Sequence, residues 1–152
     1  MGKVLIVYPS PLGATGETAR AVMEELSARG LQVDLRPTTE VSSLDGYDAV
    51  ILGSAVHLRH WHREAMHFLA RHAADLAGTP TWLFQTGPYG RHGEDQHADP
   101  PQAVVEYAAE IGAEAPKVFG GNLSGPERNC DEVSHWSDRI ADRVLAGQLT
   151  RA

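Results

Sequence analysis

The sequence predicts an α/β protein in which helices cover both faces of a parallel β-sheet. Two apolar runs, residues 3–8 (KVLIVY) and 48–54 (DAVILGS), are nearly continuous, which is typical of strands buried on both faces. Five strand-like segments alternate with stretches in which apolar residues recur every three or four positions. This alternation favours a parallel sheet, because right-handed helical crossovers connect parallel strands.

The N-terminal half of the pattern begins with the strand at residues 3–8. A helix is expected over residues 17–29, where apolar residues have helical spacing and Gly30 follows as a C-terminal stop. Residues 31–35 alternate like an edge strand. A polar connection then leads to the second buried strand, at residues 48–54.

The C-terminal half continues the same alternation. A longer helix is expected over residues 61–76, ended by Gly78 and Pro80. The remaining elements are a strand at 81–85, a helix at 101–111 with proline in its first turn, a strand within 116–121 and a helix at 131–145. Trp136 is expected in the core under the last helix.

Length and composition restrict the function. With 152 residues, 42% of them hydrophobic and 22% charged, the chain fits a single domain over residues 1–152. The N-terminal apolar run is too short for a membrane span and leads into a loop without a cleavage site, so a cytoplasmic protein is expected. The formal charge of −7 disfavours nucleic-acid binding. This charge suits positively charged partners, or it serves solubility alone.

Cysteine and histidine give no strong metal signal. The single cysteine, Cys130, excludes an internal disulfide and disfavours a cysteine-based zinc site. The histidines of the helix at residues 61–76 lack the four-residue spacing that places two imidazoles over one metal. A weak surface metal site is conceivable at His92, Glu94, Asp95, His97 and Asp99. No functional metal is expected.

The most informative stretch is YPSPLGATGETA, residues 8–19, which follows the first strand and opens the first helix. Such a loop presents backbone N–H groups and the positive end of the helix dipole to an anion, and Ser10 and Thr15 add hydroxyl donors. Only Gly13 and Gly16 are present and lysine is absent, which excludes a P-loop and a dinucleotide fingerprint. The stretch predicts a site for one terminal phosphate. The alternative is a turn in which Thr15 caps the helix.

Two further loops are candidates for the same ligand site. Ligands of open α/β sheets bind outside the carboxyl ends of the strands, near the point where the strand order reverses. The candidate loops are therefore residues 9–16, 55–62 and 86–100.

With these loops in place, the chain resembles the flavodoxin superfamily. Four stretches carry the resemblance: YPSPLGATGETA (8–19), GYDAVILGSAVHLRHWHREA (46–65), TGP (86–88) and VFGGNL (118–123). The resemblance implies a flavodoxin-like three-layer sandwich with a five-stranded parallel sheet of order 2-1-3-4-5 that binds FMN. Within the superfamily, the chain is most similar to the flavodoxin-domain branch that includes the menaquinone-dependent protoporphyrinogen oxidases.

The resemblance also implies which residues contact FMN. Those of the phosphate loop are Ser10, Leu12, Gly13, Ala14, Thr15 and Gly16; those near the isoalloxazine ring are Ser54, Ala55, His57, Trp61, Thr86, Gly87 and Tyr89. Trp61 packs on or near the ring, or instead anchors the start of its helix. Tyr89 is the aromatic candidate for the outer face of the ring. No catalytic base or nucleophile is required, because the flavin does the chemistry.

Three residues depart from the flavodoxin pattern. Leu12 stands where flavodoxins usually have a hydroxyl, and Pro11 lacks an N–H donor, so weaker phosphate binding is expected. Glycine usually occupies the position of Arg59 and lets a peptide turn over when the flavin is reduced. We therefore expect poor stabilisation of the one-electron-reduced flavin. Arg59 or a protonated His60 near the pyrimidine edge would instead favour the reduced flavin anion.

The function implied is electron transfer between a reductase and an acceptor. An alternative is an FMN-dependent oxidoreductase of the protoporphyrinogen oxidase type, although the connection at residues 122–134, NLSGPERNCDEVS, lacks the extra basic and aromatic segment of those enzymes. A further alternative is a flavodoxin fold that has lost FMN and acts as a binding module. A receiver domain is excluded, because Pro9, Ser10, Ser54 and Ala55 occupy the places of its acidic residues.

Overall fold

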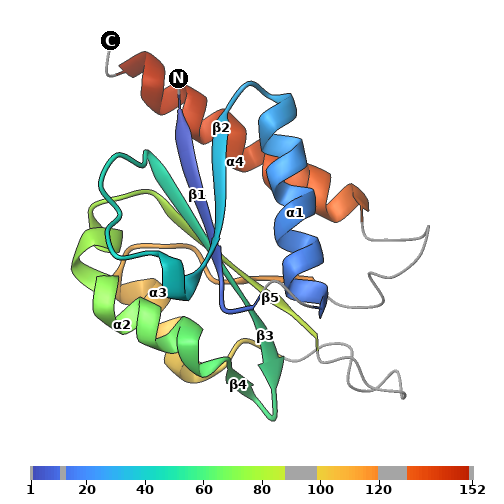
Figure 1. Ribbon diagram of the computed structural model, residues 1–152, viewed down its shortest axis with the longest axis vertical. Coiled ribbons are helices and arrows are strands. Elements are labelled where there is room, and N and C mark those ends of the chain that lie inside the picture. The colour runs from blue at the N-terminus through green and yellow to red at the C-terminus, as the bar shows by residue number, and fades with distance from the viewer. Residues whose placement is uncertain (1, 11–12, 88–98, 120–129, 151–152) are drawn as a thin grey trace.

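In the computed structural model the chain forms a three-layer α/β sandwich (Figure 1). The structure describes residues 2–10, 13–87, 99–119 and 130–150. The elements follow in the order β1 (Lys3–Tyr8), α1 (Gly13–Ala28), β2 (Gln32–Pro37), the 3₁₀-helix η1 (Thr38–Glu40), β3 (Ala49–His57), β4 (His60–Trp61), α2 (Arg63–Ala77), β5 (Thr81–Thr86), α3 (Gln102–Glu110), β6 (Lys117–Phe119) and α4 (Cys130–Thr150).

Five strands form a parallel sheet in the order β2-β1-β3-β5-β6. This confirms the expected topology, since β5 and β6 are the fourth and fifth strands of the sequence prediction. The edge position of β2 also agrees with its alternating sequence. The structure adds β4, which pairs antiparallel with the end of β3.

The helices divide between the two faces of the sheet. Helices α1 and α4 cover one face, and α2 and α3 cover the other (Figure 1). Strand β1, the second in the sheet order, serves both cores: Val4 and Ile6 pack under α1 and α4, whereas Leu5 and Val7 pack under α2, and all four are fully buried. Successive strand residues point to opposite faces, which explains why this segment is a continuous apolar run.

Several element boundaries differ from the sequence prediction, and three of them lie near the predicted ligand loops. Helix α1 begins at Gly13 instead of residue 17, and Gly13 takes a φ of +81°, which glycine adopts without strain, where the loop turns into the helix. Strand β3 continues to His57 because its end pairs with β4. Helix α2 begins at Arg63 because Trp61 belongs to β4 and His62 caps the helix, its Nδ1 accepting a hydrogen bond from the Glu64 N–H at 3.1 Å.

The helices of the described residues are amphipathic rather than uniformly apolar. None of them is long and apolar enough to cross a membrane.

Three aromatic rings organise the core under α1 and α4. The ring of Phe84 on β5 lies edge-on to Phe119 and Trp136, with centroid distances of 6.0 and 5.8 Å. Trp136 therefore lies in the core under the last helix, as predicted. Gly53 on β3 lies directly against Phe84, and a Cβ atom at Gly53 would overlap with the Phe84 ring. The aromatic cluster thus requires glycine at this position of the central sheet.

Replacement of Gly53 by alanine is expected to lower the free energy of unfolding by about 3 kcal/mol, because an overpacked core forces side chains out of their rotamers. Urea denaturation followed by tryptophan fluorescence measures this change. Gly78→Ala is the control, since the nearest atom to a Cβ there is the Asp75 carbonyl oxygen at 3.8 Å. Equal stability of the two variants would contradict the packing of Gly53 against Phe84.

Candidate functional site

The three loops predicted to bind a ligand each follow a parallel strand that finishes at the same end of the sheet. Strand β1 ends at Tyr8, β3 at His57 and β5 at Thr86. Strands β3 and β5 are in register there, with Ala55 the Cα partner of Thr86. The ends of β3 and β5 and the start of α1 therefore meet in one region.

The N-terminus of α1 provides the part of this region that suits an anion. The N–H groups of a first helical turn have no carbonyl partners within the helix and carry the positive end of its dipole. The first turn of α1 contains no acidic residue. Gly13 is exposed, and the space that a Cβ would occupy there is open. Backbone N–H groups and hydroxyls, without a carboxylate, are a donor set that fits a phosphate.

A buried hydroxyl pair joins α1 to the end of β5. Thr15 Oγ1 and Thr86 Oγ1 are 2.6 Å apart, and both side chains are buried. The two hydroxyls carry two hydrogens, and their mutual bond uses one of them. The second hydrogen can be donated to an oxygen atom of a ligand. The pair thus links the helix start to the end of β5 and leaves one hydroxyl hydrogen for a further acceptor.

The loop that follows β3 is a tight hairpin with two residues in its turn. His57 pairs with His60 and Val56 with Trp61. Leu58 and Arg59 between them have φ values of 49° and 66°, and positive φ at both central residues is the mark of a type I′ turn. Each of these non-glycine residues costs about 1–3 kcal/mol in this conformation, so contacts elsewhere must hold the hairpin.

Two side-chain contacts hold the hairpin against the sheet. Ser54 Oγ accepts a hydrogen bond from the His62 N–H at 3.0 Å and donates one to the Ala55 carbonyl oxygen at 2.9 Å. The Trp61 indole Nε1–H donates to Gln85 Oε1 at 2.8 Å, and both side chains are buried. Gln85 is a supporting residue that the sequence reasoning missed. The available signal was an amide side chain inside a predicted strand, where a buried polar group requires a hydrogen-bond partner.

The predicted FMN contacts divide by exposure. Gly13, Ala55 and His57 are exposed, and Ser10 and Ala14 are half-buried. These five residues can therefore touch a ligand. The buried ones are Thr15, Gly16, Ser54, Trp61, Thr86 and Gly87. Trp61 is only 4% exposed and packs in the core beside α2, so here it anchors β4 and the start of that helix. Leu12 and Tyr89 lie outside the described residues.

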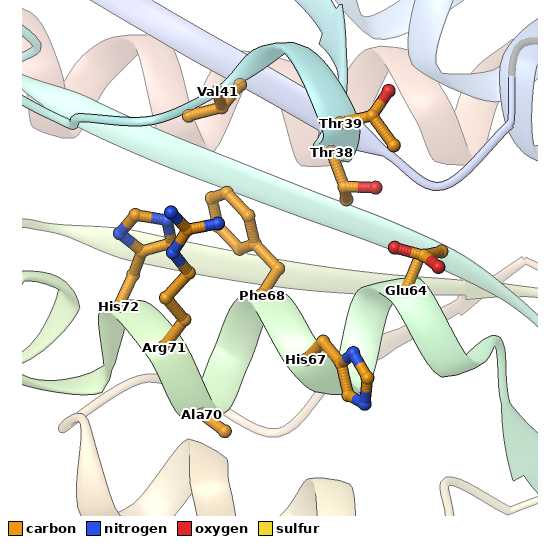
Figure 2. A pocket seen from close by; sticks show the side chains of 9 residues that line it. All are labelled: Thr38, Thr39, Val41, Glu64, His67, Phe68, Ala70, Arg71 and His72. Atoms are coloured by element: carbon orange, nitrogen blue, oxygen red, sulfur yellow. The ribbon is translucent and has the colours of Figure 1, made fainter.

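A groove lies between η1 and α2, away from the candidate loops (Figure 2). This groove has a volume of about 620 Å³, and none of its described lining residues belongs to the three candidate loops. His72 and Phe68 pack together at its base, with ring centroids 4.6 Å apart. Burial lowers the pKa of His72, and the positive charge of Arg71 lowers it further. The folded protein therefore favours the neutral imidazole.

The described residues contain no group of three or more His, Cys, Asp or Glu side chains arranged to hold a metal ion. Of the loop residues considered for a weak surface site, only Asp99 belongs to the described residues; His92, Glu94, Asp95 and His97 lie outside them.

Comparison with protein families and curated sequences identifies relatives of this chain. A family model described as a flavodoxin domain matches residues 5–130. A curated protein named flavodoxin, from Maridesulfovibrio salexigens, is 30% identical over 158 aligned residues, which cover 95% of this chain and 100% of that protein.

Solved structures share the same fold. An archaeal flavodoxin has a TM-score of 0.71 at 20% identity, covering 94% of this chain and 99% of that one. Oxidised flavodoxin 2 from Bacillus cereus has a TM-score of 0.69 at 24% identity, covering 93% and 99%. The rubredoxin:oxygen oxidoreductase of Desulfovibrio gigas has a TM-score of 0.72 at 19% identity and matches over 36% of its own length and 95% of this chain. These matches confirm the expected fold class.

Acid is expected to destabilise the protein through His72. An unfolded histidine binds a proton below about pH 6.5, whereas the folded state keeps His72 neutral to lower pH. The free energy of unfolding that His72 contributes is therefore fully present above pH 6.5 and is lost as the pH falls through its folded-state pKa. Urea denaturation of the wild type and of His72→Leu at pH 7 and pH 5.5 measures this contribution.

The expected result is a smaller loss of stability between the two pH values in His72→Leu than in the wild type. His67→Gln, an exposed change on the same helix, serves as the control and should keep the wild-type loss. The same loss in all three proteins would contradict the role assigned to His72.

Proposed function

Because the chain belongs to the flavodoxin domain family, we propose that it is an FMN-binding redox protein that receives electrons from a reductase and passes them to an acceptor. The family match and the flavodoxin relative support FMN as the cofactor and an electron-transfer flavoprotein as the type of protein. The observation that carries the proposal is the Thr15–Thr86 bond, which brings the start of α1 to the ends of β5 and β3.

The FMN phosphate would be bound at the start of α1. Gly13 and Ala14 leave room for an oxygen atom to approach the backbone, and their N–H groups lie at the positive end of the helix dipole. Ser10 and Thr15 would add hydroxyl contacts. Leu12 and Gly16 would contribute backbone N–H groups of the same loop. This arrangement recognises phosphate without a lysine or arginine.

The isoalloxazine ring would lie between the β3–β4 hairpin and the end of β5. Ala55 and His57 are the exposed residues on the hairpin side. Thr86 and Gly87 end the neighbouring strand, and Tyr89 follows them in the sequence as the proposed aromatic cover. Ser54 and Trp61 hold the hairpin in position through their hydrogen bonds. Bound FMN would supply reversible electron transfer, and these side chains would set its orientation and exposure.

Arg59 would tune the flavin. Arg59 stands in the turn with positive φ, two residues after the proposed contact His57, and its guanidinium carries a fixed positive charge. A positive charge near the pyrimidine edge would favour the reduced flavin anion.

The second candidate is an FMN-dependent oxidoreductase of the protoporphyrinogen oxidase type, which rests on the resemblance carried by residues 8–19, 46–65, 86–88 and 118–123. Oxidation of protoporphyrinogen with a quinone acceptor by the FMN-loaded protein would favour this candidate. A preparation that takes up no FMN would favour a binding module instead of either redox function.

Titration of the apoprotein with FMN and with riboflavin tests the proposed function. FMN is expected to bind at least about 100-fold more tightly, because charge-assisted hydrogen bonds to a phosphate contribute about 1.5–3 kcal/mol each. Ala14→Glu places a negative charge at the start of α1 and should weaken FMN at least about tenfold while leaving riboflavin unchanged. Flavin fluorescence quenching measures both affinities.

Ser27→Glu is the matched control for this substitution. Ser27 is exposed on the same helix, 13 residues further on, which corresponds to about 20 Å along the axis. This variant should bind FMN as the wild type does. Equal affinities for FMN and riboflavin, or equal effects of the two glutamates, would contradict a phosphate site at the start of α1.

A further inference from the structure

The tip of the β3–β4 hairpin presents a large apolar side chain to solvent. Leu58 is 78% exposed, and the next large hydrophobic residue among those that the structure describes, Val105, is 36% exposed. A single exposed leucine is common on protein surfaces. Leu58 differs in that it projects from a strained turn that the sheet holds in place.

The conformation of the tip is fixed before any partner binds. Leu58 and Arg59 both have positive φ, and strained positions of this kind persist where surrounding contacts determine them. The Trp61–Gln85 and Ser54–His62 hydrogen bonds provide those contacts at the base of the hairpin. A preorganised side chain loses little conformational freedom on binding, which favours its use as an anchor.

The residues around Leu58 are positively charged, whereas the rest of the protein is negatively charged. The exposed residues of the hairpin surface are His57, Leu58, Arg59, His60, His62 and Arg63. Residues 57–63 contain two arginines and no acidic residue, and Glu64, which follows, is half-buried. Since the whole chain has a formal charge of −7 and this segment contributes +2, the rest of the chain carries −9.

From these observations we propose that the hairpin surface docks an acidic protein, which receives Leu58 in an apolar pocket rimmed by carboxylates. An extended polyanion would be repelled by the remaining charge of −9, whereas a protein can present a compact acidic patch to the hairpin alone. The overall negative charge of the chain favours positively charged partners, whereas the local positive charge of the hairpin surface favours a negatively charged partner. The inference rests on the proposed function, because the hairpin borders the proposed position of the flavin ring.

The experiment measures binding of an acidic haem protein, cytochrome b5, to the FMN-loaded protein by isothermal titration calorimetry at an ionic strength of about 10 mM and again at about 150 mM. Arg63→Glu reverses one charge on the hairpin surface and places it favourably at the N-terminus of α2, so the fold is retained. This variant is expected to weaken binding about tenfold at low ionic strength. Leu58→Ser is expected to weaken binding at least about threefold at both ionic strengths, because it removes an apolar contact.

Matched controls lie on other faces of the molecule. Arg20→Glu makes the same charge reversal on α1, and Val105→Ser removes an exposed apolar side chain on α3. Both should bind cytochrome b5 within about twofold of the wild type. Equal effects of Arg63→Glu and Arg20→Glu, no effect of Leu58→Ser, or no measurable binding at low ionic strength would overturn the proposal.

Two additional measurements separate the alternatives. Binding to phosphatidylglycerol vesicles or to a thymidine oligonucleotide that exceeds binding to cytochrome b5 would overturn the choice of a protein partner. The visible absorbance of the protein before cytochrome b5 is added reports FMN independently of docking. A protein that takes up no FMN refutes the proposed function, and the same titration with the apoprotein still decides whether the hairpin surface binds an acidic partner.

Discussion

The hydroxyl contact between Thr15 and Thr86 is the interaction on which the candidate site depends. These residues are 71 positions apart in the sequence, and their Oγ1 atoms are 2.6 Å apart in the buried interior. The bond links the start of α1 to the last residue of β5, and β5 is in register with β3 at Ala55 and Thr86. The start of α1 is therefore held against the strand ends of the candidate site by this buried contact.

A second group of polar side chains supports the hairpin beside this contact. Ser54 and Gln85 are buried Cα partners on adjacent strands. Ser54 binds the backbone of His62, and Gln85 binds the indole of Trp61. Buried polar groups with satisfied hydrogen bonds specify a single geometry, because any other arrangement leaves one of them without a partner. The position of the strained turn at Leu58 and Arg59 follows from these bonds.

Much of the fold follows from local sequence patterns, and much of the site geometry does not. The strand Lys3–Tyr8 was predicted with its observed bounds, because a continuous apolar run has one stable place in a parallel sheet. The hairpin was not predicted, because type I′ turns are signalled by asparagine or glycine and this one has Leu58 and Arg59. Trp61 was assigned to the helix for the same reason. Its contact with Gln85, 24 residues away, depends on strand register, which a local pattern does not contain.

A double-mutant cycle on Thr15 and Thr86 tests the central claim most directly. The free energy of FMN binding would be measured by fluorescence quenching for Thr15→Val, Thr86→Val and the double variant. The account predicts that each single change weakens FMN about tenfold and that the double variant binds no more weakly than Thr15→Val, because either change breaks the same contact. The account would be contradicted if the losses of FMN affinity in the two single variants multiplied in the double variant. It would also be contradicted if neither single variant lost affinity.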